Sequence, residues 1–220
     1  LVSADHMFDV TSSLLDHKIP LFVEKPPALS LAETEALADK TSSLNVSTMV
    51  GLNRRYYSIF KNALRALDVS HTIYGVSIEG HERYWTLADI PEKVQKNWIF
   101  ANSIHHIDLL RFFGGEISHL VCFASATRET SGDQFIASGV SSSGILLNYL
   151  SHWHSPGGWS VTLFYDHKTI KFSPLEQGFI YSTDGSSLPI TPDNCDTVFK
   201  PGFYHQSVAF LRMATSGILE

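Results

Sequence analysis

The sequence has few of the residues that define several protein classes, and each shortage excludes one class. The 220 residues include only two cysteines, Cys122 and Cys195, which is too few for a disulfide framework and fits a reducing, cytoplasmic compartment. No apolar run approaches the roughly 18 residues that cross a membrane. Lysine and arginine number 16 against 22 acidic residues, so the excess of positive charge that nucleic-acid binding needs is missing. We therefore expect neither a membrane nor a nucleic acid as a partner.

Two further shortages concern the surface and cofactor binding. Charged residues make up 17% of the chain, against about 25% in typical proteins, which predicts extra buried surface such as an oligomer interface. The dinucleotide-binding motif G-x-G-x-x-G is absent, because Gly114-Gly115 follows a predicted helix and Gly157-Gly158 lies in a turn. Leu1 and Val2 resemble the tail of a buried strand, and the chain turns apolar again at its other end, so we expect it to be a fragment of a longer protein.

Apolar periodicity predicts an α/β part followed by an α+β part. Over residues 1–52, two helices alternate with two strands, which is typical of parallel βαβ units. Ser30 and Glu33 form a capping box that opens the second of these helices. In residues 53–220, two helices come early, strand segments follow one another between 117 and 182, and a last helix covers 203–214. Strands in succession with helices grouped around them indicate a mainly antiparallel sheet with helices on one face.

Two groups of polar residues stand where chemistry is expected. Lys25 follows a predicted parallel strand, and ligands of open α/β sheets bind outside the carboxyl ends of strands, so Lys25 could hold a substrate hydroxyl or a cofactor. In the predicted helix 103–113, His105 and Asp108 are three residues apart and share a face. A histidine beside a cleft suits general-base catalysis, because its ordinary pKa is near about 6.5. The alternatives are a surface lysine in a turn and a surface helix on which the two side chains merely pair.

Three signals in this order resemble the Gfo/Idh/MocA family, named after glucose–fructose oxidoreductase, inositol dehydrogenase and a rhizopine-catabolism protein. The first is His6 just after a strand, and the second is Glu24-Lys25-Pro26, about eighteen residues later. The third is His105-His106-Ile107-Asp108-Leu109-Leu110, followed by a glycine pair. The segment Gly51-Leu52-Asn53-Arg54-Arg55 also resembles the family's join between its two domains. The resemblance spans essentially the whole chain.

This resemblance implies a domain organisation and an activity. Residues 1–52 would be the C-terminal part of a Rossmann-type dinucleotide-binding domain, and residues 53–220 a substrate and oligomerisation domain with a large open sheet. The activity would be hydride transfer between NAD or NADP and a hydroxyl-bearing carbon of a sugar, cyclitol or sugar derivative. The protein would form a homodimer or homotetramer through the open sheet. The residue that distinguishes NAD from NADP lies in the part of the Rossmann domain that the family places before Leu1.

The resemblance also assigns roles to individual residues. Lys25 would match the lysine that holds the substrate hydroxyl near the nicotinamide, His105 the histidine that takes the hydroxyl proton, and Asp108 the acid one helical turn further on. These three are the predicted catalytic residues. The predicted cofactor-binding residues are His6, Glu24, Lys25 and Pro26. The predicted substrate-binding residues are Arg55, Asn102 and His106.

One departure from the family keeps other interpretations open. Many members have an aspartate four residues before the histidine, where this chain has Ala101. Asn102 follows and cannot act as a base. His106, which has Asn102 four residues before it, is then an alternative to His105, although only His105 keeps the spacing to Asp108. The alternative function is that of a non-catalytic sugar-binding or scaffolding relative with the same fold.

The remaining candidates have less support from the sequence. His152 and His154 lie on one face of a predicted strand, and two imidazoles can bind zinc together with a carboxylate. No third ligand stands at motif spacing, so we expect no metal site. Cys122 is expected to be an inert core residue, and Tyr204-His205 to be an ordinary helix start. Five aromatic residues could stack on a sugar ring, although most of them are expected to belong to the core or an interface: Tyr84, Trp85, Trp98, Trp153 and Trp159.

Overall fold

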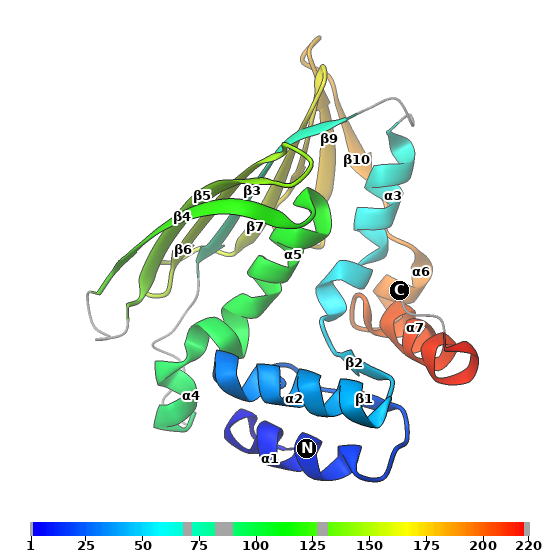
Figure 1. Ribbon diagram of the computed structural model, residues 1–220. Helices are drawn as coiled ribbons and strands as arrows, with labels where there is room; N and C mark the ends of the chain where they lie inside the picture. Colours follow the sequence, from blue (N-terminus) through cyan, green and yellow to red (C-terminus); the bar gives the residue numbers. More distant parts are fainter. Residues whose placement is uncertain (1, 68–71, 82–89, 127–131, 218–220) are drawn as a thin grey trace.

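The computed structural model describes residues 2–67, 72–81, 90–126 and 132–217, and it contains two sheets (Figure 1). The smaller sheet pairs two parallel strands, with Leu21 opposite Thr48 and Val23 opposite Val50. Its elements are η1 (Ala4–His6), α1 (Met7–Leu15), β1 (Leu21–Val23), α2 (Leu31–Leu44) and β2 (Thr48–Val50). The predicted alternation of helices and strands is therefore confirmed.

Local sequence explains where α2 begins and ends. Ser30 Oγ accepts a hydrogen bond from the backbone N–H of Glu33 at 3.2 Å, and Glu33 Oε2 accepts one from the backbone N–H of Leu29 at 3.2 Å. The predicted cap is thus present, except that the Glu33 side chain bonds the backbone N–H of Leu29 and not that of Ser30. At the other end, Asn45 adopts a left-handed conformation with φ of 52°, which stops the helix.

The larger sheet has eight strands in the order β10-β9-β8-β7-β3-β6-β5-β4. In this sheet β3 is inserted between β6 and β7, and it runs parallel to β6 and antiparallel to β7. A simple meander of eight strands would have only antiparallel pairs. The other pairs are antiparallel, so the predicted mainly antiparallel sheet is confirmed. The strands are β3 (Ile73–His81), β4 (Ile117–Ser125), β5 (Gln134–Ser141), β6 (Leu146–His152), β7 (Trp159–Tyr165), β8 (Lys168–Phe172), β9 (Gly178–Ser182) and β10 (Ser187–Ile190).

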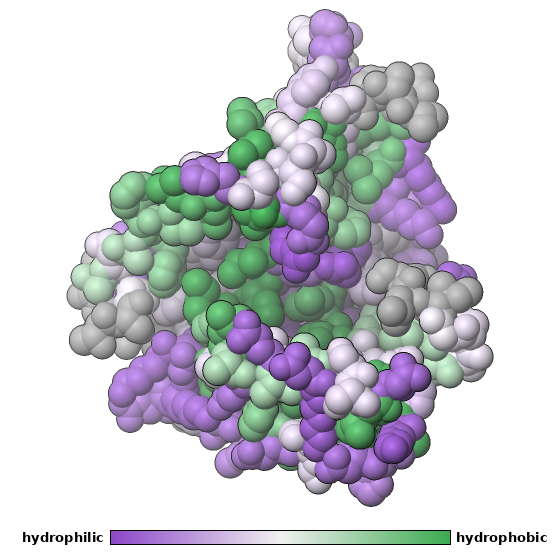
Figure 2. Space-filling model, viewed as in Figure 1, coloured by the Kyte–Doolittle hydropathy of each residue, from purple (hydrophilic) through white to green (hydrophobic). Residues whose placement is uncertain are grey.

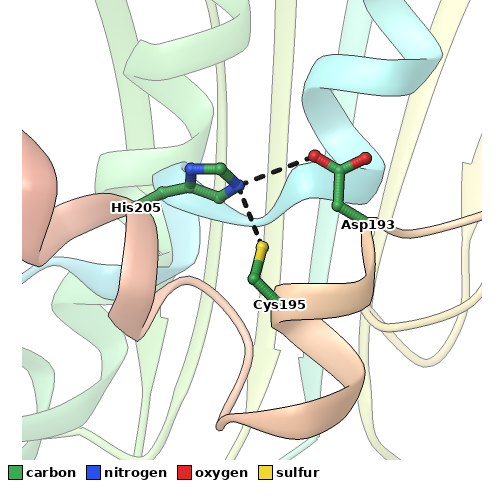
Figure 3. Close-up of side chains that lie close together, drawn as sticks. All are labelled: Asp193, Cys195 and His205. Carbon is green, nitrogen blue, oxygen red and sulfur yellow. Dashed lines mark hydrogen bonds and ion pairs between the residues drawn. The ribbon is translucent and has the colours of Figure 1, made fainter.

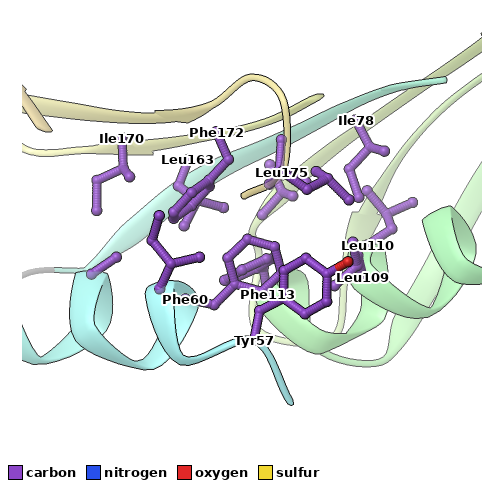
Figure 4. Close-up of a cluster of buried hydrophobic side chains, with 14 of the residues drawn as sticks. Tyr57, Phe60, Ile78, Leu109, Leu110, Phe113, Leu163, Ile170, Phe172 and Leu175 are labelled. Carbon is purple, nitrogen blue, oxygen red and sulfur yellow. The ribbon is translucent and has the colours of Figure 1, made fainter. Parts of the chain in front are cut away.

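Two helices, α3 (Ser58–Ala66) and α5 (Ile104–Gly114), cover one face of this sheet and form the main core (Figures 1 and 4). The ring of Phe60 on α3 contacts those of Phe113 on α5 and Phe172 on β8, with ring centroids 5.2 and 4.7 Å apart. Gly115, with φ of 83°, caps the end of α5, as the glycine pair predicts. The core therefore fixes α5, the helix that carries His105, against the sheet.

The opposite face of the sheet and its β4 edge are apolar and exposed. Phe164 alternates with the core residues Leu163 and Tyr165 along β7, so its side chain points away from the helices. Figure 2 shows apolar side chains gathered over the β4 edge. Cys122 is exposed on this edge strand, so its expected core position is wrong. The reason is that β4 pairs on one side only and leaves residues on both faces uncovered.

Several elements were not predicted, and some of them join the two regions. They are η2 (Asn53–Tyr56), α4 (Glu92–Lys96), the π-helical turn η4 (Ile99–Ser103), β10 and α6 (Asn194–Val198). The last helix, α7 (Phe203–Ser216), lies beside β1, because the rings of Phe22 and Phe210 are 5.3 Å apart. Within the described residues, no helix has the length and apolar character needed to cross a membrane.

Candidate active site

Lys25 stands at the carboxyl end of β1, where the small parallel sheet opens towards the rest of the molecule. The backbone N–H of Gly51 donates to Val23 O at 2.8 Å, so the ends of β1 and β2 lie side by side. Glu24 is exposed at the same edge, and a Cβ atom added to Gly51 would lie 3.4 Å from its Oε2. The peptide bond between Lys25 and Pro26 is cis. Glu24 and Lys25 thus occupy the edge at which ligands of open α/β sheets bind.

The side chain of Lys25 reaches the turn that leads into α5. Its Nζ donates to the backbone carbonyl of Ala101 at 2.7 Å and to Asn102 Oδ1 at 3.4 Å. Both acceptors belong to η4, whose residues are followed directly by the helix carrying His105. Residues about 75 positions apart in the sequence are thereby brought together. This contact places a cationic donor next to a histidine-bearing helix.

His105 is buried, with 4% of its surface exposed, and its Nδ1 atom has no hydrogen-bond partner. Burial, together with the smaller effects of the nearby charges of Lys25 and Arg54, lowers the pKa of His105 to about 2. The imidazole is therefore neutral at neutral pH. A buried ring nitrogen without a partner costs free energy, and a bound ligand could supply the missing hydrogen bond.

Asp108 does not pair with His105, its neighbour on the helix face. Its two carboxylate oxygens accept hydrogen bonds from Arg55 Nε, at 3.0 Å, and from Arg55 Nη2. This fork-shaped pair raises the pKa of Arg55, chiefly through the hydrogen bond to Asp108. Only 7% of Asp108 is exposed, so the alternative of a surface helix with a His–Asp pair is wrong. The pair joins η2 to α5 and holds the helix in place.

His106 is packed more deeply than His105. None of its surface is exposed, and a Cβ atom added to Gly80 on β3 would lie only 2.2 Å from its Cε1. Its ring meets that of Trp159 edge-on, with centroids 3.9 Å apart. Burial lowers the pKa of His106 to about 3, with smaller contributions from Arg54 and His81. The ring is wedged between α5 and the sheet.

Arg54 was missed as a site residue by sequence reasoning. Its guanidinium lies 4.0 Å from the centroid of the Trp159 ring, and its Nη1 donates to Tyr57 Oη at 2.8 Å. It also contributes to the lowered pKa values of His105 and His106. The only signal in the sequence is its position beside Arg55 at the predicted domain boundary.

The other predicted residues are distributed around this region. His6 is exposed at the start of α1, 3.8 Å from Asp5, and Pro26 is buried after β1. A cavity of about 520 Å³ lies between η2, α3, α5 and α7, and Arg55 is one of its lining residues, with Tyr57, Phe112, Tyr204 and His205. The structure therefore brings together Lys25, Asn102 and His105, and separately pairs Arg55 with Asp108.

His152 is the last residue of β6 and His154 lies in the turn after it, so the prediction that both lie on one strand face is wrong, and neither belongs to a three-ligand group among the described residues. His152 stacks on His81 with ring centroids 5.7 Å apart, whereas His154 Nε2 lies 3.2 Å from the buried carboxylate of Asp133. Trp98 and Trp153 are buried, as expected for core residues. Tyr84 and Trp85 lie outside the described residues.

No family model matches the chain. It is similar to the structure of a Gfo/Idh/MocA family oxidoreductase from Vibrio cholerae, with a TM-score of 0.78 and 20% identity over 100% of this chain and 69% of that one. The chain has the fold of the Gfo/Idh/MocA oxidoreductases. An oxidoreductase from Agrobacterium radiobacter, solved with NAD+, L-tartaric acid and magnesium, has the same fold at a TM-score of 0.76 and 14% identity, over 99% of this chain and 69% of that one.

One curated relative adds a likeness in sequence to this Gfo/Idh/MocA fold. It is scyllo-inositol 2-dehydrogenase (NAD(+)) from Bacillus subtilis, which is 31% identical over 100 residues. The match covers 44% of this chain and spans 29% of the length of that protein. Because one fold can serve several functions, the activity has to be argued from the residues of the site.

Proposed function

We propose that this chain is part of an NAD- or NADP-dependent oxidoreductase that acts on a hydroxyl-bearing carbon of a sugar, cyclitol or sugar derivative. The observation that carries the proposal is the contact between Lys25 Nζ and the turn before α5, which sets a cationic donor beside the neutral ring of His105. Proteins of the same fold include one solved with NAD+, and the curated relative is a dehydrogenase of an inositol. Both support the class of reaction.

The residues present fit the nicotinamide end of such a cofactor. The carboxyl ends of two parallel strands meet at Val23 and Val50, and the exposed Glu24 and the Lys25 ammonium lie there. We infer that Glu24, Lys25 and Pro26 would hold this end of the cofactor, with His6 at the start of α1. When bound, NAD or NADP would accept or supply the hydride. The motif that binds the pyrophosphate does not occur in these 220 residues.

Each side chain of the site then has a separate task. Lys25 donates a hydrogen bond to the substrate hydroxyl and fixes its orientation relative to the nicotinamide. His105 is neutral and would take the hydroxyl proton on a ring nitrogen when the substrate carbon is oxidised. Asp108 acts on this step through the pair with Arg55, which fixes α5. Asn102 accepts a hydrogen bond from Lys25, and His106 is adjacent to His105 in the sequence. Positive charges at Lys25 and Arg54 disfavour a lasting imidazolium, so the proton is passed on to solvent.

The test is a nicotinamide absorbance assay of the protein that contains this chain. NAD+ and NADP+ are each supplied with inositols, free sugars and nucleotide sugars, and the purified protein is compared with Lys25→Ala and His105→Ala. We expect His105→Ala to lose about 10²- to 10⁴-fold in turnover, as is typical when a proton-transfer group is removed, and Lys25→Ala mainly to raise KM, because the substrate hydroxyl loses the group that orients it. Lys171→Ala and His17→Ala, at exposed positions, are matched controls and should keep their activity.

Two results would overturn this assignment. Full activity in both variants would remove Lys25 and His105 from the reaction. Binding of a sugar without any substrate-dependent change in nicotinamide absorbance would support the non-catalytic alternative. A pH profile of kcat/KM separates the two predicted roles, because loss of the base changes the profile, whereas loss of an orienting lysine mainly raises KM.

We further infer that the exposed face of the large sheet is covered by a second copy of the chain. Ile136 alternates with the core residue Ala137 on β5, and Phe123 on β4 lies directly opposite Ile136. Phe164, Phe179 and Tyr181 continue the exposed apolar face towards β9. Contiguous exposed apolar surface of this kind marks an interaction site. Light scattering on the wild type and on Phe164→Glu should give a homodimer or homotetramer and a smaller species, respectively; a monomeric wild type contradicts the inference.

A further inference from the structure

A thiol, an imidazole and a carboxylate converge where the loop after β10 meets the first turn of α7. Figure 3 shows Asp193, Cys195 and His205 pointing towards one another. His205 Nε2 lies 3.3 Å from Cys195 Sγ and 3.7 Å from Asp193 Oδ2. One ligand atom from each residue lies within 4.8 Å of the other two. None of the residues assigned to hydride transfer belongs to this cluster.

Two of these distances are close to the edges of a zinc coordination sphere, and the third pair of ligand atoms lies within 4.8 Å. Zinc binds a histidine nitrogen or a carboxylate oxygen at about 2.0–2.2 Å and a thiolate at about 2.3 Å, so two ligands of a tetrahedral ion are about 3.3–3.6 Å apart. The separations of 3.3 and 3.7 Å are close to these edges. The donor set also selects the metal, because a thiolate and an imidazole suit zinc-type cations and not magnesium or calcium.

Hydrogen bonds from neighbouring residues hold these three side chains in position. Asn62 Nδ2, on α3, donates to Asp193 Oδ1 at 2.9 Å and leaves Oδ2 directed at His205. The next acidic residue, Asp196, is buried and accepts hydrogen bonds from the backbone N–H groups of Ser58 and Gly202, at 2.6 and 2.9 Å. The segment that carries Asp193 and Cys195 is thus fixed at both sides before any ion binds.

The geometry argues against a cysteine nucleophile at this place. In a catalytic triad the acid bonds one ring nitrogen and the nucleophile faces the other. Here Asp193 and Cys195 both approach Nε2 of His205.

We propose that Asp193, Cys195 and His205 form a site for one zinc-type divalent cation, with three protein ligands and an open fourth position. Binding forms bonds from the metal to Sγ, Nε2 and Oδ2, and the thiol proton of Cys195 is released to solvent. The fourth position would be taken by water. The ion would connect Asp193 and the short helix α6 to α7, whose first turn also contributes His205 to the wall of the 520 Å³ cavity.

The proposal is tested on the purified protein after a chelator has removed bound metal. Zn²⁺ is titrated in competition with a chromophoric chelator, and Co²⁺ is added separately as a spectroscopic probe. We expect one equivalent per chain and a thiolate-to-cobalt charge-transfer band. Saturating Zn²⁺, at about 100 times its Kd, should raise the thermal midpoint by about 5–10 °C. Cys195→Ser and His205→Gln should each lower the affinity at least 100-fold, and Asn62→Ala by about 10- to 100-fold.

Matched controls separate this site from surface binding. Cys122→Ser removes the other cysteine, which is exposed on β4, and His17→Gln removes an exposed histidine on the far side of the sequence; both should bind like the wild type. Circular dichroism of the metal-free variants checks that each one folds. Binding of Zn²⁺ only at millimolar concentration, equal affinity in Cys195→Ser, or a cobalt band that is lost in Cys122→Ser would each overturn the proposal.

Discussion

The two histidines at the centre of the two proposed sites lie in opposite environments. His105 is 4% exposed and is surrounded by the cations Lys25 and Arg54, whereas the side chain of His205 is 27% exposed and faces a carboxylate and a thiol. The first environment keeps an imidazole neutral and leaves one nitrogen without a partner. The second environment places a thiol and a carboxylate near one ring nitrogen. The same residue type is thus kept neutral by burial in one place and is placed for metal binding in the other.

The first prediction concerns the charge pair that fixes the helix of His105. Arg55→Met should lower the free energy of unfolding by about 3 kcal/mol, because it leaves the buried Asp108 carboxylate without its partner. Arg111→Met breaks an exposed pair with Glu116 at the end of the same helix and should cost less than about 1 kcal/mol. Urea unfolding measures both, and equal losses would mean that Asp108 is effectively solvated.

The second prediction concerns the packing beneath His105. Gly80→Ala should destabilise the protein by about 2 kcal/mol, because the added Cβ atom would lie 2.2 Å from Cε1 of the buried His106 ring. Gly158→Ala is the matched control, since nothing lies within 4 Å of its added Cβ atom, and it should change stability by less than about 0.5 kcal/mol. Thermal or urea unfolding gives both values. A neutral Gly80→Ala would show that α5 can move away from β3 freely.

The contrast between the two histidines also shows which features of the sites could be predicted from the sequence. Lys25 and His105 were predicted together because each stands at a recognisable place, a strand end and a helix face. In the structure, Lys25 Nζ donates to the turn that leads into the helix of His105. The pairing of Asp108 with Arg55 was not predicted, because 53 residues separate them and only tertiary packing brings them together. Helical spacing alone pointed instead to His105 as the partner.

The cluster around His205 was missed for the same reason. Asp193 and Cys195 belong to a loop and a five-residue helix, and His205 to the next helix, so their spacing matches no metal-binding motif. The edge position of β4 could not be predicted either, because the sequence of an apolar strand does not show where the strand lies in the sheet. Cys122 was therefore wrongly assigned to the core. Element types could be predicted from periodicity, whereas strand order and the insertion of β3 depend on long-range contacts.

The third prediction uses the lowered pKa of His105. The unfolded chain takes up a proton on this residue below a pH of about 6.5, whereas the native protein does so only near pH 2. The unfolded state therefore binds more protons in this window, and the free energy of unfolding falls as the pH falls below about 6.5 and is unaffected above it. Between pH 7.5 and pH 5.5, the fall should be smaller by about 1.4 kcal/mol in His105→Asn than in the wild type. His17→Asn serves as the control, and an unchanged pH dependence in His105→Asn would show that this ring is not buried in the neutral form.

The smallest expected effect is at the His205 cluster without metal. The side chain of Asp193 is 43% exposed and its pair with His205 spans 3.7 Å, so Asp193→Asn in metal-free protein should cost less than about 1 kcal/mol. Asp196→Asn, three residues away, replaces a buried carboxylate that accepts two backbone hydrogen bonds, and should cost more. Added Zn²⁺ should then stabilise the wild type and leave Asp193→Asn nearly unchanged. A large loss in metal-free Asp193→Asn would mean that the cluster is a structural polar network by itself, and the contrast with His105 would then rest on burial alone.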